Sequence, residues 1–323
     1  MNTVRVFAEG VAKQIHDYLP AEYGNVRCEI QENLKNNSVR LVGIEFHKPD
    51  STVSPVLYME SYYEDIKQGK EVGIVMQDIA NSYIQHERSS RAIDERSLKD
   101  YEYVRQWIEP VLLNTADNRE MLAQMPHRKM ADLSLFYSVV FPDQGDDMRA
   151  SMKIKNGHMA YWSVSEQDLY TQAISNIESR ETNTLFPMDS VLAAMLTGRE
   201  NGQNLLKATP GENMQSLPGG MYVLTNEQKT YGASLLAVPG IMEKVSQLLP
   251  EGYYILPSSI HETIILPKPC GVPAKELGEM VRDINRTQVN REERLSDCVY
   301  EYDKEKHAIR QVPESVRRRG MER

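Results

Sequence analysis

The sequence has 323 residues, of which 41% are hydrophobic and 26% are charged, and its formal net charge is −9 at pH 7. This balance is that of an ordinary globular protein with a sizeable core, which argues against a disordered chain. The acidic net charge argues against a general nucleic-acid binder, because such proteins need a basic face. No stretch of the sequence approaches the roughly 18 consecutive apolar residues of a membrane-spanning helix.

Hydrophobic periodicity divides the first part of the chain into helices and short strands. Apolar residues at three- and four-residue steps predict helices over 4–19, 56–67, 72–83 and 101–108, and a short helix near 117–125. Strands are predicted over 26–32, 39–46 and 111–114. Asn36 and Asn37 favour a tight turn between the first two strands. Ser54 and Pro55 have the residue types of a helix cap and first turn, so they are predicted to open the helix over 56–67.

The second part of the chain shows the same alternation of short elements. Strands are predicted over 133–141, 148–154 and 221–225, with turns at 143–147 and at Asn156 and Gly157. Helices are predicted after the capping residue Ser165, over 188–196, over 235–249 and over 273–289. Residues 198–220 lack periodicity and predict a long loop. Two hairpins complete the pattern, one formed by 253–256 and 263–266, the other by 298–302 and 308–312.

These elements predict an α+β fold with mixed or antiparallel sheets covered by amphipathic helices. We expect an N-terminal α+β lobe over 1–126, a C-terminal α+β lobe over 127–312, and a charged, flexible tail over 313–323. A helix that ends in Leu-Pro, followed by an acidic residue, a tyrosine and a hairpin, occurs at 19–23 and again at 249–253. This echo indicates either a repeated helix–hairpin unit or the separate termination of two helices by Leu-Pro.

The cysteines and the N-terminus point to a reducing compartment. Cys28, Cys270 and Cys298 are odd in number and far apart, so they predict neither a zinc site nor a disulfide framework. Residues 1–14 are interrupted by charges and lack the apolar core of a signal peptide. Because reduced thiols are typical of a reducing compartment, we expect the protein to be cytoplasmic.

Several motifs spread over the chain carry a family resemblance. They are Lys35-Asn36-Asn37, Ser54-Pro55 with the tyrosines of 58–63, the run 221–226, the run ILPSSIHE at 255–262, and 280–289 with Leu295-Ser296-Asp297. With these motifs the chain resembles an uncharacterised bacterial family, a domain of unknown function found mainly in gut anaerobes. Residues 132–137 and 165–176 are more faintly similar to the YtpQ-like family. Neither family has a known function, so the resemblance implies an intracellular α+β protein and no catalytic residues.

The polar corner between the strands of the first C-terminal hairpin is the candidate site. It consists of Ser258, Ser259, His261 and Glu262, and on an extended strand Ser259 and His261 would share one face. A serine near a histidine fits a nucleophile–base pair, but the GxSxG turn that presents such a serine is absent. The alternatives are a binding surface on a rigid hairpin, or side chains that only satisfy turn amides.

Metal and cofactor sites are not indicated. The seven histidines are scattered, and none falls in an HxH, HxxxH or HExxH spacing. Pro218-Gly219-Gly220 lacks the lysine of a phosphate-binding loop and predicts a turn. The basic run over 317–319 predicts a solvated terminus, with RNA contact as a weaker alternative. We therefore expect no metal, no cofactor and no nucleic-acid partner.

Two classes of function remain open. The first is a non-catalytic interaction or regulatory module, whose protein partner the sequence does not identify. The second is a hydrolase or transferase with its site at residues 258–262. The first is favoured because no set of residues has a specific catalytic spacing. A concave pocket that holds His261, with a carboxylate on its far ring nitrogen, would favour the second.

Overall fold

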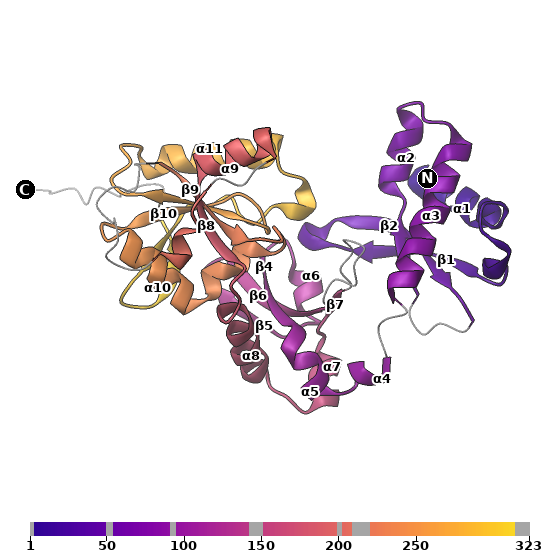
Figure 1. The fold of residues 1–323 in the computed structure, drawn as a ribbon, viewed down its shortest axis with the longest axis horizontal. Coiled ribbons are helices and arrows are strands. Elements are labelled where there is room, and N and C mark those ends of the chain that lie inside the picture. The colour runs from indigo at the N-terminus through magenta and orange to yellow at the C-terminus, as the bar shows by residue number, and fades with distance from the viewer. Residues whose placement is uncertain are drawn as a thin grey trace, which may run out of the picture. The chain divides into compact units, whose positions relative to one another are not determined.

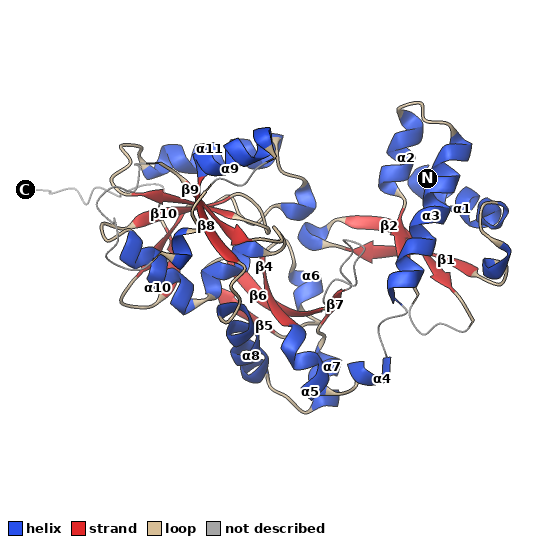
Figure 2. Ribbon diagram, in the orientation of Figure 1, coloured by secondary structure: helices blue, strands red, loops and turns tan. Residues whose placement is uncertain are grey.

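The computed structural model describes residues 3–49, 54–90, 95–141, 151–198, 202–208 and 220–313. It combines helices with three sheets, and every strand pair of defined register is antiparallel (Figure 2). The expected α+β class is therefore confirmed. The chain divides into two compact units, one with residues 1–107 and 139–152, the other with 108–138 and 153–323. The expected lobes over 1–126 and 127–312 stay a prediction, and the expected tail lies outside the described residues except for Pro313.

The first unit contains a three-stranded sheet, on which the helices over residues 3–14 and 72–90 pack (Figure 1). The strands are β1 (Arg27–Leu34), β2 (Arg40–His47) and β3 (Val56–Tyr58), in the order β1-β2-β3. The helices are α1 (Thr3–Gln14), α2 (Glu60–Lys67), α3 (Val72–Ser90), α4 (Glu95–Leu98) and α5 (Tyr101–Val104). Short 3-10 turns are η1 (Ile15–Asp17), η2 (Ala21–Tyr23), η3 (Asn36–Ser38) and η4 (Arg105–Trp107).

The core of the first unit follows from alternation along β2. Val42, Ile44 and Phe46 point to the same face and are buried against α1 and α3. The ring of Phe46 stacks on that of Tyr83 with 4.4 Å between centroids. The predicted helix over 4–19 and hairpin over 26–46 are present, and Asn37 adopts the left-handed conformation expected in the turn.

The predicted helix over 56–67 is wrong at its start. Residues 56–58 form β3, which pairs with β2, and the helix α2 begins only at Glu60. The glycine of β2 explains the strand: a Cβ on Gly43 would lie 2.6 Å from Cγ1 of Val56, so the missing side chain makes room for a third strand. Ser54 does not cap a helix, because its Oγ lies 2.9 Å from Nδ1 of His47.

The second unit contains a sheet of order β4-β6-β5, with β7 also paired to β6, and a six-stranded sheet of order β13-β12-β10-β11-β9-β8. Two of these strands, β6 and β7, cross the division between the units. The strands are β4 (Ile108–Asn114), β5 (His127–Met130), β6 (Leu133–Val140), β7 (Ser151–Lys153), β8 (Asn183–Pro187), β9 (Tyr222–Asn226), β10 (Tyr253–Pro257), β11 (Thr263–Pro267), β12 (Tyr300–Asp303) and β13 (Ala308–Gln311). The helices are α6 (Arg119–Leu122), α7 (Asn156–Trp162), α8 (Glu166–Glu178), α9 (Met188–Thr197), α10 (Pro239–Leu248) and α11 (Ala274–Thr287). Three 3-10 segments are η5 (Leu205–Lys207), η7 (Gly232–Ala237) and η8 (Arg291–Glu293).

Helices cover both faces of the six-stranded sheet, with α9 and α11 on one side and α10 on the other (Figure 1). Leu256 of β10 packs with Leu277 and Val281 of α11. Tyr253, three positions before Leu256 in β10, points to the other face, where its hydroxyl lies 3.2 Å from Oγ of Ser246 in α10. The sheet is thus the inner layer that positions the corner at residues 258–262.

Two further expectations are corrected, and one strand was not expected. The helix over 101–108 stops before Ile108, which begins β4; Pro110 fits there because β4 is an edge strand. Asn156 and Gly157 open α7 instead of forming a turn. Strand β8, over Asn183–Pro187, was not expected, because its five residues carry no alternation. The turn over 143–147 and the basic run over 317–319 lie outside the described residues.

The similar sequences at 19–23 and 249–253 have similar local structure. In both places a helix is followed by an antiparallel hairpin, α1 by β1 and β2, and α10 by β10 and β11. An origin by duplication stays a prediction.

Candidate functional site

Main-chain hydrogen bonds close the corner that joins β10 to β11. The amide of Ser259 donates to the carbonyl of Glu262 (3.1 Å), and the amide of Ile260 donates to the carbonyl of Glu293 (2.8 Å). The amide of His261 donates to Oγ of Ser259 (3.0 Å). One serine therefore satisfies a turn amide, as serines often do in tight turns.

Hydrogen bonds from residues distant in sequence hold His261 in place. Its Nδ1 accepts a hydrogen bond from the amide of Tyr231 (3.2 Å), and the two rings stack with 5.8 Å between centroids. Its carbonyl accepts a hydrogen bond from Oγ1 of Thr225 (2.8 Å). Burial lowers the pKa of His261, and the carboxylates of Glu293 and Glu262 offset part of that shift. The imidazole is thus held neutral, with Nδ1 as its acceptor.

A glycine allows the main chain to come close enough to His261 for these contacts. A Cβ on Gly232 would lie 2.4 Å from Oγ1 of Thr225 and 2.5 Å from the carbonyl oxygen of His261. Such distances are too short for any side chain, so the main chain of η7 reaches the corner only because residue 232 is glycine.

The serines and His261 of the corner do not form the nucleophile–base pair that the enzyme hypothesis requires. Oγ of Ser259 accepts a hydrogen bond from the amide of His261 in its own turn, and Nδ1 of His261 accepts one from a main-chain amide. Oγ of Ser258 donates to Oε1 of Glu262 at 3.4 Å. No hydrogen bond between either serine and the imidazole occurs among the described residues, although nucleophilic catalysis requires one.

Glu262 differs from the other corner residues, because it lines a cavity. The cavity has a volume of about 80 Å³ and lies between α9 and the strands β8 and β9. Its apolar lining consists of Phe186, Val191, Ala194, Met195 and Val223. Its charged lining consists of Glu227, Lys229 and Glu262. No sequence pattern indicated this cavity, because the strand β8 that forms one wall carries no alternation of apolar and polar residues.

The helix above this cavity is apolar and exposed. Apart from Asp189, Ser190 and Thr197, α9 consists of apolar residues, yet none of its residues is buried. Leu196 is 87% exposed, Met195 67% and Leu192 50%. Large apolar side chains grouped in this way on one helix are typical of a contact surface.

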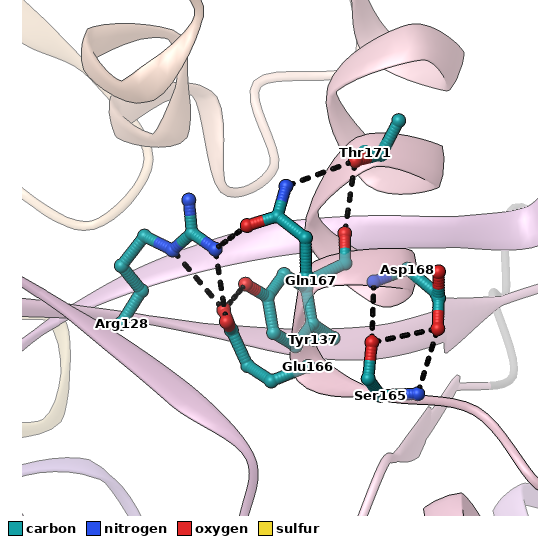
Figure 3. Close-up of polar contacts among 7 residues, drawn as sticks. All are labelled: Arg128, Tyr137, Ser165, Glu166, Gln167, Asp168 and Thr171. Atoms are coloured by element: carbon teal, nitrogen blue, oxygen red, sulfur yellow. Dashed lines mark hydrogen bonds and ion pairs between the residues drawn. The ribbon is translucent and has the colours of Figure 1, made fainter.

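A dense polar network joins β5 and β6 to the start of α8 (Figure 3). Nη2 of Arg128 donates to the carboxylate of Glu166 (2.9 Å) and to Oε1 of Gln167 (2.7 Å), while its guanidinium lies 3.8 Å from the ring centroid of Tyr170. The hydroxyl of Tyr137 also donates to Glu166. Burial opposes ionisation of Glu166, but the bonds from Arg128 and Tyr137 outweigh it and lower the pKa of that carboxyl. The polar groups of this network bond mainly to one another, so we interpret the network as a structural link that holds the start of α8 against β5 and β6.

A second polar network joins sheet to helix in the same unit. Asp132, in the turn between β5 and β6, accepts hydrogen bonds from the hydroxyl of Tyr300 (2.7 Å) and from Oγ of Ser296 (3.0 Å). Nδ2 of Asn285, in α11, donates to the carbonyl of Ser296 (2.9 Å) and to Oδ1 of Asp297 (2.7 Å). These contacts involve the motifs at 280–289 and 295–297, and they give those motifs a structural role.

A serine–histidine contact that no sequence motif indicated occurs in the first unit. Besides its contact with Ser54, His47 places Nε2 3.4 Å from Oε2 of Glu29. Ser54 precedes Pro55 and the strand β3, so it does not lie on the sharp strand-to-helix turn that presents a nucleophilic serine. The contact is therefore interpreted as a polar cluster on the outer face of the hairpin.

The described residues contain neither a metal-binding cluster nor a membrane-spanning helix. No group of three or more His, Cys, Asp or Glu side chains there is arranged to hold a metal ion. Within the same residues, no helix combines the length and the apolar character needed to cross a bilayer.

The fold and the corner define an α+β protein of antiparallel sheets in which main-chain contacts fasten the predicted site. By its sequence the chain belongs to a family of unknown function, DUF5688, whose model matches residues 4–304. No curated protein and no solved structure matches the chain. The expected membership in a family of unknown function is confirmed, and the fainter similarity to the YtpQ-like family stays a prediction.

Proposed function

We propose that this protein is a non-catalytic interaction module that binds a protein partner through the corner and α9. One observation carries the proposal: Glu262 of the corner and Met195 of α9 line the same cavity. Ser258, Ser259 and His261 then serve to hold the corner, and Glu262 presents its carboxylate to the partner. The exposed apolar residues of α9 surround the point of contact.

The energetics of α9 favour a partner. Full burial of a leucine or methionine side chain is worth about 1.5–3 kcal/mol. Leu192, Met195 and Leu196 leave most of that free energy unused, since each is at least half exposed. A partner that covers α9 would recover part of it on binding.

The cavity indicates what kind of partner fits. Its volume of about 80 Å³ is well below the ~300–1,000 Å³ of small-molecule pockets, so an aliphatic side chain fits better than a cofactor. Two carboxylates, Glu227 and Glu262, outnumber the single ammonium of Lys229 in its lining. The expected partner is therefore a protein segment with one aliphatic anchor residue next to a lysine or arginine.

The compartment is part of the proposal. Cys28, Cys270 and Cys298 are all free thiols, which supports action in the reducing cytoplasm of a bacterium. Burial also raises the pKa of Cys28 to about 11, so this thiol is protonated and unreactive at neutral pH.

The hydrolase or transferase alternative rests on the same corner and has less support. It requires Ser258 or Ser259 to contact a free imidazole nitrogen, whereas each serine hydroxyl is used within its own turn. The interaction module needs no such contact.

Affinity purification from the native cell tests the proposal. The unchanged chain is compared with Met195→Glu and Glu262→Lys, and with Tyr161→Glu as a matched control, because Tyr161 is 64% exposed on a different helix. We expect one protein to copurify with the unchanged chain and the control, and its recovery to fall about tenfold or more in the other two variants. Equal recovery with all four chains, or recovery of no partner, would contradict the proposal.

A further inference from the structure

A second cavity of the second unit is separate from the corner. It has a volume of about 590 Å³, within the ~300–1,000 Å³ range of small-molecule sites. Its walls are the end of α8 with the residues after it, the segment η5, and one face of α10. None of its lining residues belongs to the lining of the cavity at Glu262.

The inner wall of this cavity is apolar. Leu206 of η5 and Ile241 of α10 are 7% and 4% exposed, and Leu205, Ala208 and Leu248 extend the same surface. An apolar wall of this extent favours a ligand with a hydrocarbon or aromatic body.

The positive charges of the lining are only partly compensated. Lys207 and Lys244 are exposed, and neither ammonium group has a hydrogen-bond or ion-pair partner among the described residues. Arg180, by contrast, is paired with the buried carboxylate of Glu109. Two ammonium groups are thus available to a ligand.

The lining also carries two carboxylates. Glu178 lies at the N-terminus of α10, where its Oε1 stands 1.9 Å from the position that a Cβ on Gly240 would take. A helix N-terminus stabilises a carboxylate in its charged form, so this group is already engaged within the fold. Glu181 is exposed, and neither carboxylate forms an ion pair with Lys207 or Lys244 among the described residues.

We propose that this cavity binds a small organic anion with an apolar body, whose carboxylate or phosphate group lies between Lys207 and Lys244. The apolar body contacts the wall formed by Leu206 and Ile241. Such a ligand would give the interaction module a regulatory input. The site shares no residue with the partner surface, so either proposal can fail without the other.

Calorimetric titration of the purified chain with four probes tests the site. The probes are octanoate, octyl phosphate, the neutral alcohol 1-octanol and inorganic phosphate. We expect saturable binding of octanoate, octyl phosphate or both, and at least about tenfold weaker binding of octanol and inorganic phosphate. Binding of octanoate alone assigns a carboxylate ligand, and binding of octyl phosphate alone assigns a phosphate ligand.

Charge variants complete the test. Lys207→Gln combined with Lys244→Gln should weaken binding of the anionic probe about tenfold or more. Lys275→Gln, which changes a lysine 68% exposed on α11, should leave it unchanged. Both lysines of the cavity are on the surface, so the double variant is expected to fold. No saturation by either anionic probe up to about 5 mM, equal binding of octanol, or unchanged affinity in the double variant would overturn the proposal.

Discussion

The amide of Tyr231 donates a hydrogen bond to Nδ1 of His261, and the rings of the two residues stack. Thirty positions apart in sequence, these residues tie η7 to the connection between β10 and β11. The most chemically suggestive side chain of the corner is thereby used to hold the corner in place.

The first prediction concerns the loss of this imidazole. His261→Ala leaves the amide of Tyr231 without its acceptor, and a partly buried unpaired donor costs about 1–3 kcal/mol. We expect the free energy of unfolding at pH 7.5, measured in urea, to fall by about 2 kcal/mol. His261→Asn retains an acceptor near the position of Nδ1 and should restore most of the loss. Unchanged stability of His261→Ala would show that the imidazole is free to act in binding.

The pH dependence of stability follows from the lowered pKa of the same histidine. In the unfolded chain the pKa of a histidine is about 6.5, and in the fold the pKa of His261 is lower. The contribution of the neutral ring is complete above pH 6.5, and it is lost as the pH falls towards the folded pKa, because the unfolded chain takes up the proton first. His86 and His158, whose pKa values burial also lowers, act in the same direction.

Comparison with the asparagine variant isolates the share of His261. Between pH 7.5 and 5, the stability of His261→Asn should fall less steeply than that of the unchanged chain. Thermal unfolding followed by circular dichroism at several pH values measures both slopes. Parallel slopes would mean that His261 titrates alike in the folded and unfolded states.

A glycine substitution tests how closely η7 approaches the corner. A side chain at Gly232 would meet Thr225 and the carbonyl of His261 within 2.5 Å, so Gly232→Ala should lower the stability by about 2–3 kcal/mol. Gly157→Ala is the control, because no atom lies within 4 Å of its added Cβ. In the helix α7 it should be neutral or slightly stabilising. Equal effects in the two variants would contradict the packing described here.

The polar network around Asp132 gives a prediction for Tyr300, which is 0% exposed. Burial and the nearby Asp132 raise the pKa of Tyr300, so its phenol stays protonated and donates to the carboxylate. Tyr300→Phe should cost about 1.5–3 kcal/mol in urea unfolding, since a hydrogen bond to a charged group is lost. Tyr161→Phe, on an exposed ring, should cost nothing measurable. If Tyr300→Phe leaves the free energy of unfolding unchanged, this network does not stabilise the second unit.

The parts of the fold that the sequence predicted are those with strong local signals. The helix α8 begins after Ser165, the expected capping residue, whose side chain accepts a hydrogen bond from the amide of Asp168. Most of the helix predicted over 235–249 is present as α10, which begins at Pro239. The hairpin of β10 and β11 lies within one residue of its expected bounds. Each of these depends on residues that are near neighbours in the chain.

The parts that the sequence missed depend on distant residues. Strand β3 exists because Val56 packs over Gly43, and the Ser-Pro pair before it has the same composition as a helix start. The corner was found as a cluster of residue types, but its partners Tyr231 and Glu293 are about thirty positions away on either side. A single sequence does not show such pairings, so it could not distinguish a corner that binds a partner from one whose side chains hydrogen-bond within the fold.

The most direct test of the interaction module is crosslinking from within the cavity. A photoreactive benzoyl-phenylalanine is placed at position 195, and in a second chain at position 161, and each is irradiated in the native cell. The proposal predicts a crosslink to one protein from position 195 that disappears when Glu262→Lys is added, and no such crosslink from position 161. Absence of any crosslink at position 195, or the same crosslink from both positions, would contradict it.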